Sequence, residues 1–240
     1  MPQHLFHHTE SAGLEIAKAL LDIKAVNLRP DQPYMLTSGW ASPTYIDCRK
    51  VISFPAVRQA IVRHWADIAA QKIGAGKIDA VAGGETAGIP YGAWLAEKMN
   101  LPMLYVRKKP KGFGRGAQIE GDFKDGQRVL LVEDMATDGA SKVAFVNALR
   151  EGGTIVTDCF VVFYYGVFPS TGQLESANVN MHYLCDWNDI LTVAESGKYF
   201  DAGIIARVRE FLADPAKWSE AHGGASLETA KLSATTGSKL

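Results

Sequence analysis

The sequence predicts an α/β fold in which a central, mostly parallel β-sheet is flanked by helices. Two observations support this prediction. Apolar runs such as 129–132 and 159–165 alternate along the chain with segments of helical periodicity, and strands that are apolar on both sides are typical of parallel sheets covered by helices on both faces. Hydrophobic residues also make up 47% of the chain, which is ordinary for a globular protein that buries a large core.

The first part of the chain predicts a smaller unit ahead of this sheet. Residues 11–25 place apolar side chains on one helical face. The stretch 29–43 contains three prolines and a glycine and predicts turns, and the alternation in 45–49 predicts a short strand. A long helix follows over 55–73. We predict no element before residue 11.

From residue 78 onward, the pattern predicts alternating strands and helices. The expected strands cover 78–82, 103–106, 129–132, 155–165 and 179–184, and the expected helices cover 89–99 and 140–151. Residues 1–220 therefore predict a single domain. The segment 221–240 is rich in Ala, Gly, Ser and Thr without apolar periodicity, and we expect a disordered tail there.

Charge and composition exclude several classes of protein. The 25 Lys and Arg residues nearly balance the 26 Asp and Glu residues, so no general attraction for nucleic acid is expected. The longest apolar run, 159–165, is too short to cross a bilayer, and the first ten residues lack the basic start of a secretory signal. The three cysteines are widely spaced and odd in number, which is typical of a reducing compartment. We therefore expect a cytoplasmic protein with no nucleic-acid or membrane partner.

Two adjacent carboxylates, Glu133 and Asp134, end the strand over 129–132. The loop that follows carries Thr137, Gly139 and Ser141 and opens into a helix. In α/β proteins, a helix that begins at the carboxyl end of a strand offers its backbone N–H groups to phosphate. Carboxylates at this strand end suit ribose hydroxyls, a metal or a developing cation. The alternative is an ordinary helix cap with incidental acids.

A strongly basic segment, 107–115, follows another expected strand. Five of its nine residues are basic and none is acidic, and glycines lie at 112, 114 and 116. A charged run is usually a solvated face, but these glycines and the preceding strand favour a mobile lid that closes on an anion. A helix N-terminus contributes only about 0.3–1 kcal/mol at an exposed site, so the lysines are the stronger catalytic candidates.

A third segment, 82–90, is a glycine-rich turn between a strand and a helix. Its glycines do not have the GxGxxG spacing of a dinucleotide-binding turn, and the chain contains no GxxxxGK[ST] phosphate-binding motif. By itself, this turn is a weak signal.

Together, the three segments resemble the type I phosphoribosyltransferases, which use 5-phosphoribosyl 1-diphosphate (PRPP). The segments 36–49, LTSGWASPTYIDCR, and 107–121, RKKPKGFGRGAQIEG, narrow the resemblance to the orotate phosphoribosyltransferases. The resemblance implies the type I phosphoribosyltransferase fold, with an N-terminal hood over about 1–50 and a mobile lid loop over about 108–120. It also implies that the enzyme transfers the phosphoribosyl group to orotate with Mg²⁺, in a homodimer that shares its lid residues.

The resemblance also implies roles for individual residues. PRPP would contact Arg107, Lys108, Lys111, Gly84, Glu85, Thr86, Glu133, Asp134, Met135, Ala136, Thr137, Asp138, Gly139, Ala140 and Ser141. The catalytic residues would be Lys111, Arg107 and Asp134, with Arg107 and Lys111 reaching the neighbouring subunit. Orotate would contact Ser38, Gly39 and Thr137. The substrates and water would hold Mg²⁺, so no protein ligand is assigned to it.

The sequence departs from the family pattern at several positions. Phe113 replaces a lid histidine, and Thr37 replaces a lysine common in the family. The stretch 161–169 lacks the arginine that usually pairs with the orotate carboxylate, and Asp138 adds a negative charge beside the expected phosphate loop. Two alternatives to an orotate-specific enzyme remain: a phosphoribosyltransferase for another base, and a non-catalytic regulator that senses PRPP. The lid residues Lys108 and Lys111 favour an enzyme.

Overall fold

The protein is built around a seven-stranded sheet with the strand order β1-β11-β10-β9-β6-β7-β8. The structure is a computed structural model that describes residues 5–7, 9–36, 39–74, 76–112, 117–137, 140–167 and 173–227. The strands are β1 (Leu5–His7), β6 (Ala80–Gly84), β7 (Met103–Val106), β8 (Ile119–Glu120), β9 (Val129–Ala136), β10 (Asp158–Tyr164) and β11 (Asn180–Cys185). All neighbouring pairs are parallel except β7 and β8, which form an antiparallel hairpin. The predicted mostly parallel sheet is therefore confirmed.

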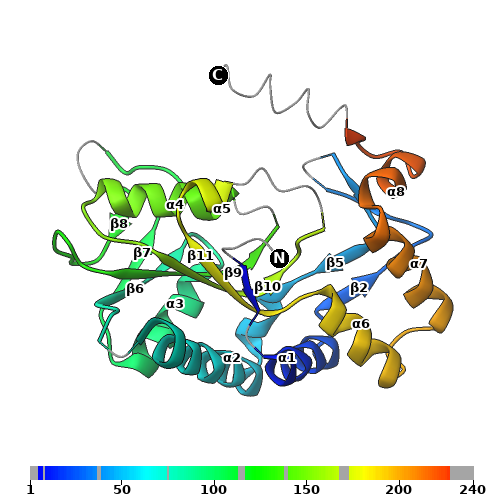
Figure 1. Ribbon diagram of the computed structural model, residues 1–240, viewed down its shortest axis with the longest axis horizontal. Coiled ribbons are helices and arrows are strands. Elements are labelled where there is room, and N and C mark those ends of the chain that lie inside the picture. The colour runs from blue at the N-terminus through cyan, green and yellow to red at the C-terminus, as the bar shows by residue number, and fades with distance from the viewer. Residues whose placement is uncertain are drawn as a thin grey trace.

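Helices cover both faces of this sheet (Figure 1). One face carries α1 (Glu10–Asp22), α2 (Pro55–Ile68), which continues as a π-helix over Ala69–Gly74, and α3 (Gly88–Met99). The other face carries α4 (Ala140–Glu151) and α5 (Gln173–Ser176). Because side chains alternate along a strand, Leu130 and Val132 of β9 join the core beneath α1–α3, whereas Val129 and Leu131 join the core beneath α4.

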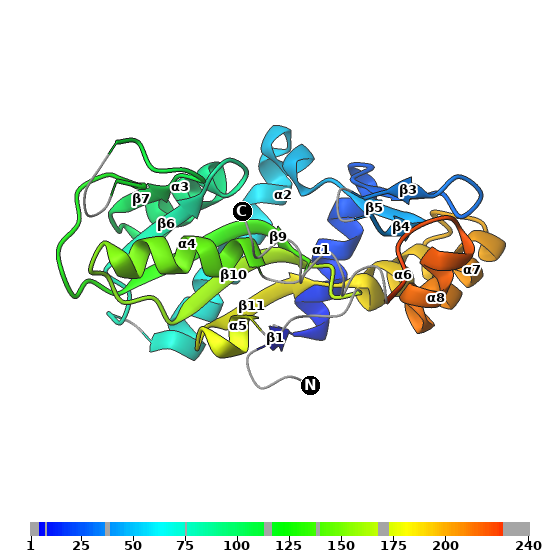
Figure 2. The same ribbon diagram turned by 90° about the horizontal axis from the view of Figure 1, so that it is seen from above.

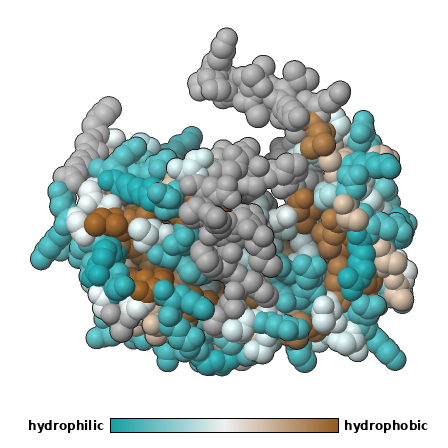
Figure 3. Space-filling model, viewed as in Figure 1, coloured by the Kyte–Doolittle hydropathy of each residue, from teal (hydrophilic) through white to brown (hydrophobic). Residues whose placement is uncertain are grey.

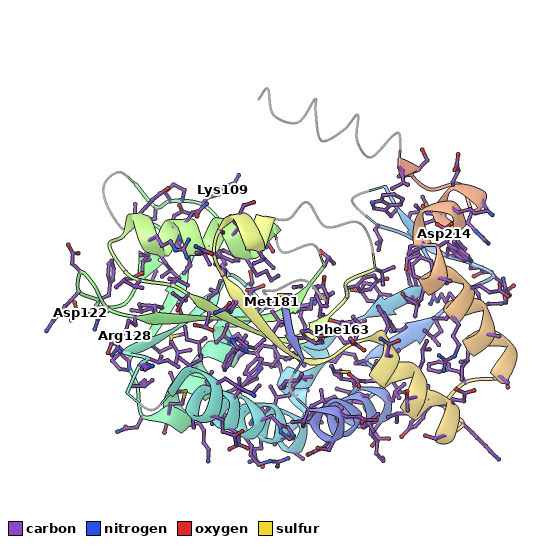
Figure 4. The ribbon with its side chains drawn as sticks, viewed as in Figure 1. Lys109, Asp122, Arg128, Phe163, Met181 and Asp214 are labelled. Carbon is purple, nitrogen blue, oxygen red and sulfur yellow. The ribbon has the colours of Figure 1, made fainter. Side chains whose placement is uncertain are left out.

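A smaller unit, the hood, lies at the carboxyl ends of the central strands (Figures 1 and 2). It contains two antiparallel pairs, β2 (Val26–Leu28) with β5 (Thr44–Ile46) and β3 (Tyr34–Met35) with β4 (Ala41–Ser42). A 3-10 helix over Cys48–Ser53 leads from the hood into α2. In Figure 4, Arg128, which precedes β9, lies at the end of the sheet away from the hood, whereas Phe163, near the end of β10, lies beside it.

The C-terminal helices complete the hood. They are α6 (Trp187–Ser196), α7 (Ala202–Ala213) and α8 (Pro215–Ala221). The buried hydroxyl of Ser219 accepts a hydrogen bond from Ala41 N at 3.0 Å and donates one to Ala225 O at 2.8 Å. Ala225 N in turn donates to Gly39 O at 2.8 Å. The described part of the segment expected to be a tail, residues 221–227, is thus hydrogen-bonded to the hood, and residues 228–240 lie outside the described part of the chain.

The predicted elements from 78 to 184 match observed ones within a few residues, and the predicted helices over 11–25 and 55–73 correspond to α1 and to α2 with its π-helical extension. The expectation of no element before residue 11 was wrong, because β1 pairs in parallel with β11. On the face in Figure 3, hydrophobic residues lie in separate small areas among hydrophilic ones. None of the helices in the described ranges is both long and apolar enough to cross a membrane.

Candidate active site

A cavity of about 780 Å³ lies between the hood and the carboxyl ends of β6 and β9. Its wall combines hood residues with residues from strand ends and loops that are far apart in the sequence. The lining residues are Tyr34, Met35, Leu36, Trp40, Tyr45, Ile46, Asp47, Cys48, Arg49, Glu85, Thr86, Ala87, Lys108, Glu133, Asp134, Met135, Thr137, Ser141, Phe145 and Tyr165. A space of this volume suits a small-molecule substrate.

The two carboxylates at the end of β9 both line the cavity and leave the strand on opposite faces. Because successive side chains on a strand alternate, Asp134 lies toward the hood and the charge of Arg49, whereas Glu133 lies toward α4. Asp134 Oδ1 accepts a hydrogen bond from Met135 N at 2.9 Å. Burial raises the pKa of the Asp134 carboxyl despite this bond and the nearby charges of Lys142 and Arg49.

Glu133 is paired with a buried lysine. Its Oε2 atom lies 3.3 Å from Lys142 Nζ, and the two side chains are 8% and 7% exposed. Its other oxygen, Oε1, is buried without a hydrogen-bond partner among the described residues. Burial raises the pKa of the Glu133 carboxyl to about 7, and the positive charge of Lys142 opposes this shift. An unpartnered carboxylate oxygen at a cavity wall is suited to accept a hydrogen bond from a ligand hydroxyl.

Two glycines leave the space that Glu133 occupies. A Cβ atom at Gly84 would lie 2.7 Å from Phe145 Cε2 and 2.9 Å from Glu133 Cδ, and one at Gly88 would lie 2.6 Å from Glu133 Oε1. Real Cβ atoms are essentially never found at such distances. The glycine-rich turn expected from the sequence therefore has a concrete steric function, which is to let the start of α3 approach the end of β9.

The turn between β6 and α3 is joined to the start of the basic segment. The peptide bond between Glu85 and Thr86 is cis. Glu85 N donates to Val106 O, and Glu85 Oε2 accepts from Lys108 N at 2.7 Å. These bonds bring Glu85, Thr86 and Lys108 to the same wall of the cavity.

The structure describes part of the segment expected to bind phosphate. Met135 and Ala136 end β9, Thr137 and Ser141 line the cavity, and α4 begins at Ala140. Asp138 and Gly139 lie outside the described residues. The first N–H groups of α4 have no partner within the helix and are available to an anion.

The structure describes both ends of the lid loop, residues 107–112 and 117–120. Beyond the β7–β8 hairpin, Arg107 N donates to Gln118 O and Lys111 N donates to Ala117 O. The guanidinium of Arg107 lies 3.3 Å from Glu120 Oε1. Lys108 lines the cavity, whereas Arg107 and Lys111 do not line the cavity of their own chain. Residues 113–116, which include Phe113, lie outside the described residues.

The expected orotate site lies at the hood. Gly39 has a φ of +86°, a backbone conformation that glycine adopts readily, and its neighbour Trp40 lines the cavity. Ser38 and Thr37 lie outside the described residues. At the position after β10 where the family arginine is missing, the Tyr165 hydroxyl lies 2.7 Å from both Ser42 Oγ and Thr44 Oγ1.

Sequence reasoning overlooked several residues of this site. Lys142 directly follows the expected loop, but a lysine in a helix is usually exposed, so only the tertiary structure shows that it is buried beside Glu133. Arg49 was part of a matching segment without an assigned role. It contacts Asp47 Oδ1 at 2.9 Å and the Tyr45 hydroxyl at 3.1 Å.

The chain is similar in sequence and in structure to known proteins. Residues 56–167 match the family model of the phosphoribosyl transferase domain. Curated orotate phosphoribosyltransferases from Cereibacter sphaeroides and Sinorhizobium fredii are 52% and 49% identical to the chain, over 85% and 87% of its length. The matches cover 89% and 90% of those relatives. The chain belongs to the orotate phosphoribosyltransferase family.

Solved structures agree with this assignment. The orotate phosphoribosyltransferase from Aeropyrum pernix has a TM-score of 0.64 at 30% identity, with 78% of this chain and 99% of that chain covered. Leishmania donovani UMP synthase has a TM-score of 0.73 at 27% identity. The match covers 85% of this chain and 43% of that longer protein. Adenine phosphoribosyltransferase from the same organism shares the fold, with a TM-score of 0.58 at 13% identity. The type I phosphoribosyltransferase fold is therefore confirmed, and the fold by itself does not select the base.

Proposed function

We propose that this protein transfers the 5-phosphoribosyl group from PRPP to orotate with Mg²⁺, forming orotidine 5′-monophosphate and pyrophosphate in pyrimidine biosynthesis. The observation that carries the proposal is the position of Glu133 and Asp134, which stand side by side at the cavity wall immediately before the phosphate loop. Family membership supports orotate as the acceptor base.

The ribose 5-phosphate part of PRPP is assigned to β9 and α4. Residues 137–141 surround the 5′-phosphate with backbone N–H groups and the Ser141 hydroxyl. Glu133 and Asp134 accept hydrogen bonds from the ribose hydroxyls. Glu133 Oε1 supports this role, since it is buried with no partner in the described part of the chain.

The diphosphate is assigned to the opposite wall. Gly84, Glu85 and Thr86 lie against it through the turn before α3, and Lys108 contacts it from the same subunit. Arg107 and Lys111 contact the diphosphate bound in the neighbouring subunit of a homodimer.

Mg²⁺ fits this site as an ion carried by the substrate. The described residues contain no group of three His, Cys, Asp or Glu side chains that could hold a metal ion, whereas diphosphate and ribose oxygens are the hard ligands that Mg²⁺ prefers. When bound, the ion neutralises charge on the diphosphate.

The chain's own residues then promote transfer in three ways. As the bond from ribose C1 to the diphosphate oxygen breaks, positive charge develops on the ribose, and the carboxylate of Asp134 stabilises it. Negative charge grows on the leaving diphosphate, where Lys108 and the partner's Lys111 and Arg107 stabilise it. Orotate N1 attacks C1 from the opposite face and gives up its proton to the released pyrophosphate. The closed lid excludes water that would otherwise hydrolyse the sugar cation.

Orotate is assigned to the hood side of the cavity, near Ser38, Gly39 and Thr137. The test is to incubate the protein with PRPP, Mg²⁺ and orotate and to follow the loss of orotate absorbance, beside parallel reactions with adenine, hypoxanthine and uracil. We expect turnover with orotate alone. Turnover of another base without turnover of orotate would contradict the proposal, and PRPP binding without turnover of any base would indicate a regulator.

A cytoplasmic location is part of this proposal, and the three widely spaced cysteines support it. The charge balance gives no indication of a nucleic-acid partner.

A further inference from the structure

We propose that Lys142 is a positioning residue for PRPP: it holds the Glu133 carboxylate and the Ser141 hydroxyl in the arrangement that receives the ribose 5-phosphate, without contacting the substrate itself. This inference rests on the proposed function for the identity of the ligand. It concerns a residue that no motif assigned to the site.

The contacts of Lys142 point to this role. Its Nζ atom lies 3.3 Å from Glu133 Oε2 and donates a hydrogen bond to Ser141 Oγ at 3.1 Å. Glu133 and Ser141 both line the cavity, whereas Lys142 does not. One ammonium group therefore joins the carboxylate assigned to the ribose hydroxyls to the hydroxyl assigned to the 5′-phosphate.

The position of Lys142 is unfavourable for stability alone. It is the third residue of α4, and the first turn of a helix disfavours a positive charge because its N–H groups are exposed there. Its side chain is only 7% exposed, so the ion pair has also lost its hydration. Apolar residues of similar volume often replace such buried pairs without loss of stability. The pair is therefore better explained by its effect on the position and the charge of the Glu133 carboxylate.

The pair leaves Glu133 with one paired oxygen and one buried oxygen that has no hydrogen-bond partner among the described residues. Oε2 faces Lys142, whereas Oε1 has no partner among the described residues and lies in the space left by Gly84 and Gly88. The charged and titratable groups around this carboxyl are Lys142 on α4, Asp134 on β9, Lys108 after β7 and the buried thiol of Cys159 on β10. Lys142 favours the ionised form of the Glu133 carboxyl more strongly than Lys108 does. The ionised form accepts hydrogen bonds at both oxygens.

The experiment measures PRPP binding and steady-state kinetics for Lys142→Met, which keeps the length and removes the charge, and for Lys142→Gln and Lys142→Arg. Lys98→Met is the matched control, because Lys98 is an exposed lysine in the last turn of α3. We expect Lys142→Met to raise the Kd and KM for PRPP at least about tenfold, with little change in the KM for orotate. Lys142→Arg should restore most of the affinity, and Lys98→Met should behave as wild type.

Two further measurements separate positioning from a merely structural role. In Lys142→Met, the acid limb of the pH profile of kcat/KM for PRPP should move to higher pH, because the buried carboxyl has lost its counter-charge. In a Glu133→Gln background, Lys142→Met should add less than about half of its effect in the wild-type background, because both changes remove the same interaction.

The outcomes distinguish this inference from the proposed function. If the wild-type protein fails to bind PRPP, the proposed function fails. If the wild-type protein binds PRPP, and folded Lys142→Met and Lys142→Gln bind it equally well, the positioning role is wrong. A full additive effect of Lys142→Met in the Glu133→Gln background would also overturn it. If Lys142→Met does not fold, the other two variants still test the positioning role. Lys142→Arg keeps the positive charge and should keep most of the affinity for PRPP, whereas Lys142→Gln removes the charge and should lose it.

Discussion

The hydroxyl of Tyr165 lies 2.7 Å from both Ser42 Oγ and Thr44 Oγ1. All three side chains are buried. These contacts join the end of β10 to β4 and β5, which are more than a hundred residues away in the sequence. They therefore attach the hood to the sheet at the edge of the cavity.

Removing this hydroxyl should loosen the hood. Tyr165→Phe leaves two buried hydroxyl groups short of a partner, so we expect the free energy of unfolding to fall by about 1–3 kcal/mol. Urea denaturation measures the change. A double-mutant cycle with Ser42→Ala provides the control, and strictly additive effects would show that the two hydroxyl groups do not interact.

A methyl group at Gly84 should displace Glu133. Since the new Cβ would lie 2.7 Å from Phe145 Cε2 and 2.9 Å from Glu133 Cδ, Gly84→Ala should lower kcat/KM for PRPP at least about tenfold. Gly203→Ala on α7 is the matched control, because nothing lies within 4 Å of its added Cβ. That variant should keep full activity and gain slightly in stability. Unchanged kinetics in Gly84→Ala would mean that Glu133 does not need this space.

The activity should depend on the ionisation of Glu133. Its carboxyl has a pKa raised to about 7 by burial, so kcat/KM for PRPP should fall as the pH drops through this value and the carboxylate takes up a proton. The phosphates of PRPP also titrate in acid, and Glu133→Gln controls for them because only the Glu133 contribution disappears. An acid limb identical in wild type and Glu133→Gln would exclude Glu133 as its source.

The same pKa shift affects stability with a defined sign. A carboxyl whose pKa is raised on folding binds its proton more tightly in the folded protein than in the unfolded chain. Between the ordinary value of 4.5 and about 7, the folded state holds more of this proton, so the Glu133 contribution to stability decreases as the pH rises. Thermal unfolding measured across this pH range checks this sign. As the pH rises, the unfolding temperature of Glu133→Gln should fall less, or rise more, than that of the wild type.

The lid should act across the proposed dimer. Lys111→Ala should lower kcat by at least about a hundredfold without loss of folding, because a cation that stabilises the leaving diphosphate is gone. Mixing it with Asp134→Ala should partly restore activity, since a mixed dimer contains one site with both intact residues. If mixed dimers form and no activity returns, each subunit uses its own lid.

Residues 222–227 should stabilise the hood. Deleting 228–240 should leave the unfolding temperature and activity unchanged, as expected for the tail that the composition predicts. Deleting 222–240 removes the contacts of Ala225 with Ser219 and Gly39 and should lower the unfolding temperature by several degrees. Equal behaviour of the two truncations would show that 222–227 contributes nothing to the hood.

Much of the fold could be predicted from local patterns. The apolar runs at β9 and β10 are long enough, and flanked clearly enough by turns and helices, to predict buried parallel strands. β1 was missed because it has only three residues and is held by pairing with β11, a partner nearly the whole chain away. The role of residues 222–227 was missed for a similar reason, since Ala225 N donates to Gly39 O near the other end of the sequence.

The sequence by itself determined the order of the chemical groups: a strand that ends in Glu133 and Asp134, a loop before a helix, and a cationic segment after another strand. These features are local, because the spacing of residues within single strands and helices is enough to predict them. Only the tertiary structure decided that Lys142 is buried against Glu133 and that Tyr165 joins the hood to the sheet. Burial and charge pairing depend on what packs around a side chain, and those neighbours come from distant parts of the chain.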